Sequence, residues 1–193
     1  DLRGISKVHM YGISSGALRA ALFAQDHPDM VDRLLMDATV WKGTGSPTLV
    51  ERSKKLPQFK ANRRRPIDVE FVRSIFTRDH PGCAEDHVVE AFAEAVCKLD
   101  TSIPNGTYVD MCENLPVVDP EELTMPCFVM RGQWDGIAGM EDLLEFFNLI
   151  PNPDKQFTVM AGISHASFQQ KNYRMVYHVM EGFLTQPAPI FKG

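Results

Sequence analysis

The first forty residues constrain the fold of this chain more than any other segment. Residues 6–11 (SKVHMY) form a short apolar stretch of the kind that makes a buried strand. Residues 16–27, rich in Ala and Leu, predict a helix that is buried on several sides. Residues 31–40 (VDRLLMDATV) predict a second strand. A strand, a tight turn, a helix and a strand make a βαβ unit, which implies a parallel sheet.

The turn between the first strand and the helix carries a G-x-S-x-G pattern, Gly12-Ile13-Ser14-Ser15-Gly16. A sharp strand-to-helix turn forces strained backbone angles on its middle residue, and small flanking residues let the turn close. Such a turn lifts the middle hydroxyl clear of the sheet, at a helix N-terminus that favours developing negative charge. The plainer interpretation is a glycine-rich turn with incidental serines.

A serine hydroxyl is a weak nucleophile at pH 7 and needs a base, whose imidazole in turn needs an acceptor. Among six histidines, His165 stands out because it lies in a loop of small residues after a predicted strand at 155–160. Asp135 follows a predicted strand at 127–131. Because the carboxyl ends of parallel strands meet at one edge of a sheet, Ser14, Asp135 and His165 are expected to lie together.

The order Ser, Asp, His in these contexts resembles the α/β-hydrolase fold superfamily. Residues 12–16 match its nucleophile elbow, residues 132–135 (GQWD) match its acid motif, and residues 162–165 (GISH) match its base motif. The resemblance implies a parallel-sheet α/β-hydrolase fold. The family's fifth to eighth strands would be those at 6–11, 33–40, 127–131 and 155–160. The residue patterns at 140–149 and 168–184 predict helices.

The resemblance also divides the chain into three segments. Residues 1–40 would be core with the nucleophile elbow, residues 41–120 an inserted helical lid, and residues 121–193 core with the acid and base loops. Within the insertion, apolar residues recur at helical spacing and no strand is expected. A run of arginines there, Arg63–Arg65, could bind a charged group of a substrate, but a solvated face is the default interpretation.

The function implied by the resemblance is acyl transfer, with Ser14 as nucleophile, His165 as base, Asp135 as its orienting acid and the Ser15 backbone N–H as an oxyanion donor. The leading hypothesis is a serine hydrolase that cleaves a small or medium carboxylic ester or lactone through an acyl-enzyme. An amide or C–C bond hydrolase, or an acyltransferase, would use the same residues. A non-hydrolytic lyase, a cofactor-free oxygenase or a ligand receptor of the same fold is a further alternative. No metal or organic cofactor is implied.

The substrate pocket is less constrained than the triad. Large side chains near the predicted strand ends or in the insertion are candidates for its lining, and each is equally a candidate for ordinary core. These candidates are Trp41, Phe76, Tyr108, Met111, Trp134 and Phe168. If several of them line the pocket, the substrate has a sizeable apolar or aromatic part.

The net charge and the cysteines of the chain limit which classes of partner and which cellular location are expected. The chain has 20 basic and 25 acidic residues, a net charge of −5, which argues against nucleic acids and anionic membranes as partners. No apolar run approaches the ~20 residues that a membrane span requires. The cysteines form no C-x-x-C pair, so a zinc site is not expected. Four cysteines that look unpaired, and no signal peptide in this sequence, favour a cytoplasmic location. The cysteines are Cys83, Cys97, Cys112 and Cys127.

The superfamily's first four strands are not recognised in this sequence, nor is the loop after its third strand that supplies a second oxyanion donor. The strand at 8–11 would then be a bare apolar edge, which soluble proteins avoid. The sequence opens at Asp1 without an initiator Met. We therefore expect that a second polypeptide, the N-terminal half of the same gene product, pairs with this processed chain.

Overall fold

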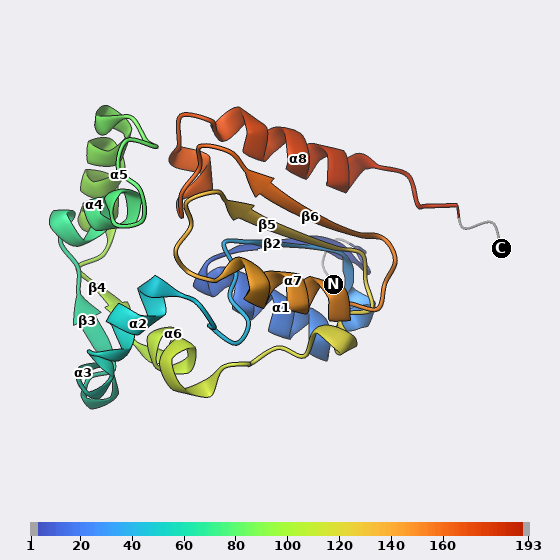
Figure 1. Cartoon of the computed structure of the whole chain (residues 1–193), viewed down its shortest axis with the longest axis horizontal. Helices are drawn as coiled ribbons and strands as arrows, with labels where there is room; N and C mark the ends of the chain where they lie inside the picture. Colours follow the sequence, from blue (N-terminus) through green and yellow to red (C-terminus); the bar gives the residue numbers. More distant parts are fainter. Residues whose placement is uncertain (1–3, 191–193) are drawn as a thin grey trace.

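A four-stranded parallel sheet forms the centre of the computed structural model, which describes residues 4–190 (Figure 1). Its spatial order is β1-β2-β5-β6, so the strands of this sheet lie side by side in the order in which they occur in the sequence. The predicted α/β fold class is confirmed. The bounds of the strands are β1 (Val8–Ile13), β2 (Val31–Asp37), β5 (Cys127–Gly132) and β6 (Lys155–Met160).

Helices cover both faces of this sheet, α1 (Ser15–Asp26) and α7 (Met140–Leu149) on one face and α8 (Tyr173–Thr185) on the other (Figure 1). Side chains alternate along a strand, so Leu34 of β2 packs with the core of α1 and α7, whereas Leu35 packs with that of α8. Burial on both faces explains why the central strands β2 and β5 are rich in apolar residues, whereas β1 and β6 at the two edges are less buried. None of the helices within residues 4–190 has the length and apolarity that crossing a membrane would need.

The predicted elements of the sheet and its helices are present, but several of their boundaries are shifted. The strand predicted at 31–40 ends at Asp37. The first strand extends through residues 12 and 13, because these two residues keep their places in the ladder beside β2. The last helix begins at Tyr173 and not at residue 168, because residues 167–169 form a separate 3₁₀ turn and Gln170 is extended.

Residues 41–120 are mostly helical, and residues 47–109 lie beyond the carboxyl ends of the strands (Figure 1). The expectation that they contain no strand is wrong, because β3 and β4 form a short antiparallel ladder. Three-residue strands are too short to show a readable alternation of apolar and polar residues. The elements are α2 (Pro47–Ser53), α3 (Leu56–Ala61), β3 (Arg64–Pro66), α4 (Val69–Thr77), α5 (Asp86–Leu99), β4 (Ser102–Pro104), α6 (Gly106–Val109) and a π-helical turn (Asp110–Asn114).

Strand β1 lies at one edge of the sheet, where β2 is its only strand partner among the described residues. The edge is apolar and exposed at its start, with 51% exposure at Ile5 and 47% at Val8. The predicted bare edge is therefore present in the described part of the chain. An edge of this kind offers unpaired backbone N–H and C=O groups to another strand.

Candidate active site

Ser14 occupies the strained turn between β1 and α1, with φ of 56° and ψ of −125°. Its N–H donates to the carbonyl of Asp37 in β2 at 2.9 Å, and its carbonyl accepts from the N–H of Ala17 in α1 at 2.9 Å, so the neighbouring strand and the helix hold the turn. A Cβ atom at Gly12 would collide with the backbone of Gly16 and Ala17. A Cβ at Gly16 would meet no heavy atom within 4 Å, so only the first of the two flanking glycines is required by close approach.

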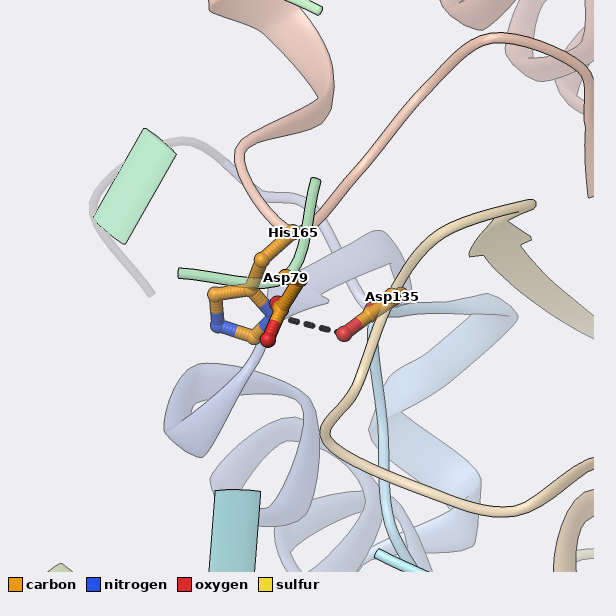
Figure 2. Close-up of side chains that lie close together, drawn as sticks. All are labelled: Asp79, Asp135 and His165. Atoms are coloured by element: carbon orange, nitrogen blue, oxygen red, sulfur yellow. Dashed lines mark hydrogen bonds and ion pairs between the residues drawn. The ribbon is translucent and has the colours of Figure 1, made fainter. Parts of the chain in front are cut away.

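The structure brings the three predicted triad residues into one line of hydrogen bonds. The distance from His165 Nε2 to Ser14 Oγ is 2.9 Å. The distance from His165 Nδ1 to Asp135 Oδ1 is 3.0 Å, and Figure 2 shows this second contact. His165 and Asp135 are buried, with 6% and 4% exposure, whereas Ser14 is half-buried. An ionised carboxylate can only accept, so Nδ1 carries the proton and Nε2 is free to accept the serine hydroxyl.

Asp135 is held by the buried guanidinium of Arg131 at the end of β5. That group donates to the carbonyls of Gly132 at 3.1 Å, Asp135 at 2.6 Å and Ala138 at 3.1 Å. Burial by itself raises the pKa of the Asp135 carboxyl, but attraction to His165, the hydrogen bonds from His165 and the Ile137 N–H, and the charge of Arg131 together hold that pKa below its usual value. Asp135 is thus an anion next to His165.

The acid and base loops pack backbone against backbone. A Cβ atom at Gly132 would collide with the carbonyls of Ile163 and Ser164. The Trp134 N–H donates to the Ile163 carbonyl at 2.9 Å. This close approach sets the separation of the two loops, and it depends on a glycine at the end of β5.

A second carboxylate, which the sequence analysis missed, lies beside the triad. Asp79 follows α4, and one ligating atom each from Asp79, Asp135 and His165 lie within 4.8 Å of one another (Figure 2). The side chain of Asp79 is 6% exposed, and its Oδ2 has no hydrogen-bond partner among the described residues. Such a trio could in principle hold a cation, but both ring nitrogens of His165 already face hydrogen-bond partners. No sequence motif marks Asp79, because only folding of the insertion brings it here.

A third carboxylate near His165 is that of Asp37, the last residue of β2. Its two oxygens accept from the hydroxyls of Tyr11 at 2.9 Å and Ser167 at 3.0 Å. Burial raises the pKa of Asp37 to about 6, even though the two hydrogen bonds and the proximity of His165 act in the opposite direction. Asp37 therefore titrates in the range where a histidine base changes charge.

The raised pKa of Asp37 predicts a pH-dependent stability. Between an ordinary value of 3.8 and a folded value of about 6, the folded state binds more protons than the unfolded state, so this carboxyl contributes less stability as pH rises. The free energy of unfolding of the wild type, relative to Asp37→Asn, should fall by about 2 to 3 kcal/mol between pH 4 and pH 7. Denaturant unfolding of both proteins at several pH values measures this difference, and a constant difference would contradict it.

A cavity of about 460 Å³ opens on Ser14 and His165. It lies between the carboxyl ends of the strands and the elements of residues 41–120. Most of the side chains that line the cavity are apolar, but four arginines line it as well. The lining side chains include Ile13, Phe71, Ile75, Phe92, Ile103, Pro104 and Tyr108, and the arginines are Arg19, Arg52, Arg65 and Arg78. A hollow of about 730 Å³ elsewhere on the surface, near the start of β1 and β2, includes none of the triad residues.

Of the six predicted pocket residues, the structure places only Tyr108 in the lining of this cavity. Trp41, Phe76 and Met111 are buried in hydrophobic cores. The other two lie elsewhere: Trp134 is exposed and stacks on His80, and Phe168 packs against Tyr11 and Tyr177. Size and position in the sequence could not tell core from cavity here.

Ser15, the predicted oxyanion donor, is the first residue of α1 and lines the same cavity. The N–H groups of a helix's first turn have no acceptor within the helix. The Ser15 N–H is therefore available beside Ser14, at the positive end of the helix dipole.

Comparison with known proteins agrees with this architecture. Residues 3–172 match the family described as serine aminopeptidase, S33. A search of curated proteins found no match. The structure of this chain is similar to that of the 2-hydroxy-6-oxo-6-phenylhexa-2,4-dienoate hydrolase of Rhodococcus sp. strain RHA1, with a TM-score of 0.62, 16% identity, and coverage of 94% of this chain and 66% of that one.

Two further solved structures show the range of proteins that share the fold. A soluble variant of monoglyceride lipase from Saccharomyces cerevisiae has a TM-score of 0.63 at 16% identity, with 95% of this chain and 63% of that chain covered. A bromoperoxidase from Bacillus anthracis has a TM-score of 0.67 at 11% identity, with 96% and 70% covered. The chain thus spans about two thirds of the length of these structures. Since the family match extends over most of its residues, the chain belongs to the serine aminopeptidase S33 family of the α/β-hydrolase superfamily.

Proposed function

We propose that this chain carries the nucleophile, base and acid of a serine hydrolase that cleaves a small or medium carboxylic ester or lactone. The observation that carries the proposal is the continuous line of hydrogen bonds from Ser14 through His165 to Asp135, with a cavity opening on Ser14. Family membership supports hydrolysis, and two of the similar structures are named as a hydrolase and a lipase.

In the proposed reaction, Ser14 Oγ attacks the substrate carbonyl carbon while its proton moves to His165 Nε2. Asp135 stabilises the imidazolium that forms, and the Ser15 N–H donates to the developing oxyanion. His165 then returns the proton to the leaving alcohol, and an acyl-enzyme remains on Ser14. A water molecule, deprotonated by His165, hydrolyses this ester and restores the free serine.

Covalent labelling tests this proposal. A fluorophosphonate probe should label the wild type at Ser14, because it reacts with a serine that a base has activated. Labelling should be lost in Ser14→Ala and in His165→Ala, and peptide mass spectrometry should locate the adduct. A folded wild type that remains unlabelled would exclude an activated serine. A panel of esters, lactones and amides, read by acid release, would then distinguish ester from amide cleavage.

We also propose that a further polypeptide segment pairs with the free edge of β1 and supplies a second oxyanion donor. The apolar exposure at Ile5 and Val8 and the open backbone edge support this pairing. Gel filtration with intact mass measurement should show that the active species contains more polypeptide than this 21.7 kDa chain. An active, monodisperse monomer of 21.7 kDa would contradict the pairing.

A further inference from the structure

The cavity beside Ser14 contains an unusual concentration of positive charge. Arg19, Arg52, Arg65 and Arg78 line it, and within residues 4–190 no Asp or Glu does. Guanidinium groups keep their charge at all ordinary pH values. Several cations that face one space without a lining carboxylate repel one another.

Two of these arginines stack on one aromatic ring. The guanidinium carbon of Arg52 lies 3.7 Å from the ring centroid of Tyr108, and that of Arg65 lies 3.5 Å from the same centroid. Stacking on an aromatic ring stabilises a cation and holds its fork of N–H donors in a fixed plane. The pair is therefore a rigid arrangement of donors, unlike a solvated surface cluster.

The hydrogen-bonding capacity of this pair is only partly used. Arg52 is 9% exposed, and its hydrogen bond in the described part of the chain is to the sulfur of Met111, a weak acceptor. Arg65 donates through Nη1 to Pro104 and Asn105, but its buried Nε has no acceptor among residues 4–190. Both guanidinium groups lack a carboxylate within 4.0 Å in the same residues.

The pKa values of Arg52 and Arg65 also indicate that these two cations lack a counter-charge. Burial lowers the pKa of Arg52, and although Tyr108 opposes this change, the charges of Arg78 and Arg65 add to it. Burial likewise lowers the pKa of Arg65. A buried cation without a counter-charge is costly, so an anion that entered the cavity would remove an existing penalty as well as form new hydrogen bonds.

We propose that Arg52 and Arg65 form a subsite for an oxyanion group of the substrate, a carboxylate or a phosphate, in the cavity that opens on Ser14. The inference rests on the proposed hydrolase function and specifies its substrate as an anionic ester. The sequence suggested that the arginine run could bind a charged group of a substrate, and the structure separates its members. Arg64 is exposed and pairs with Asp100, whereas Arg65 lines the cavity. Alternation along β3 separates these two neighbours.

A matched pair of esters tests the subsite. 4-Nitrophenyl hydrogen glutarate carries a free carboxylate, and its methyl ester has the same chain without the charge. The wild type should hydrolyse the acid with a kcat/KM at least about tenfold higher, and Arg52→Gln and Arg65→Gln should each lower this value by about 10- to 100-fold, mainly through KM. Both variants should lower kcat/KM for the neutral ester by a smaller factor than for the acid, because the neutral ester has no charge for the guanidinium groups to bind. A 4-nitrophenyl ester that ends in a phosphonate distinguishes a phosphate preference from a carboxylate preference.

Arg64→Gln is the matched control, because Arg64 is the exposed neighbour on the same strand and should behave as the wild type toward all three esters. Denaturant unfolding checks that each variant folds. If Arg52→Gln is unstable, Arg65→Gln still tests the subsite, because Arg65 is only half-buried. Equal kcat/KM for the acid and the neutral ester in the wild type, or an equal loss on both in the variants, would overturn the subsite.

A binding measurement separates the subsite from the hydrolase proposal. In the Ser14→Ala background, isothermal titration with benzyl hydrogen glutarate should give a Kd at least about tenfold lower than that of its neutral methyl ester, and Arg65→Gln should remove the difference. If Ser14 is labelled by fluorophosphonate and no anion preference appears, the subsite fails alone. If the anion preference is present and Ser14 is not labelled, the hydrolase proposal fails and the binding site remains.

Discussion

Ser14→Ala is expected to lower kcat for ester hydrolysis by about 10⁶-fold, because it removes the atom that attacks the carbonyl. The hydrogen bond from Ser14 Oγ to His165 Nε2 at 2.9 Å is the contact on which this expectation rests. The measurement is kcat on the active form of the protein, with active-site titration to exclude contamination by wild type.

The sharper form of this experiment is a double-mutant cycle. Groups that act as a unit do not contribute additively, so Ser14→Ala/His165→Ala should be no slower than either single variant. Additive losses would mean that the two residues act in separate steps, and retention of turnover in Ser14→Ala would place the nucleophile elsewhere. Ser53→Ala, at an exposed serine in α2, serves as a control that should keep wild-type kcat.

Asp135→Asn is expected to lower kcat by about 10⁴-fold, the loss known when a triad carboxylate becomes an amide. The amide N–H would face His165 Nδ1 and favour the tautomer that directs a proton toward Ser14, so Nε2 could no longer accept the serine proton. Steady-state kinetics on an ester substrate measures the effect.

The neighbouring carboxylates provide matched comparisons for this prediction. Asp79→Asn should lower kcat by about tenfold or less, because Asp79 influences His165 by charge and forms no hydrogen bond with it among the described residues. Asp37→Asn should also have a small effect, since Asp37 is engaged by Tyr11 and Ser167. If either variant lost more activity than Asp135→Asn, that carboxylate, and not Asp135, would orient the base.

The triad and the strands that carry it could be predicted from local sequence. Each triad residue follows a short apolar strand, and a parallel sheet brings the carboxyl ends of its strands to one edge whatever lies between them. The strand and helix at 155–160 and 140–149 have the predicted bounds, because their patterns extend over whole elements. Other boundaries were less predictable: the strand predicted at 31–40 ends at Asp37, and a 3₁₀ turn precedes Tyr173 at the start of the last helix.

The surroundings of the triad could not be predicted in the same way. Trp41, Phe76 and Met111 were candidates for the pocket and are buried in cores, because apolar side chains serve both places equally well. The ladder of β3 and β4 could not be predicted either. Because side chains alternate along β3, Arg65 lines the cavity and Arg64 does not.

The sequence by itself predicted the strands of the parallel sheet and the helices that pack on it, the strained serine turn and the three residues of the hydrogen-bonded triad, since each follows from a pattern within a few neighbours. The tertiary structure decided which residues surround the triad. Asp79 and Asp37 lie near His165, and Arg52 and Arg65 stack on the ring of Tyr108. These contacts join segments far apart in the chain. Their physical properties, buried charge above all, arise only when packing removes water from groups whose sequence neighbours give no sign of it.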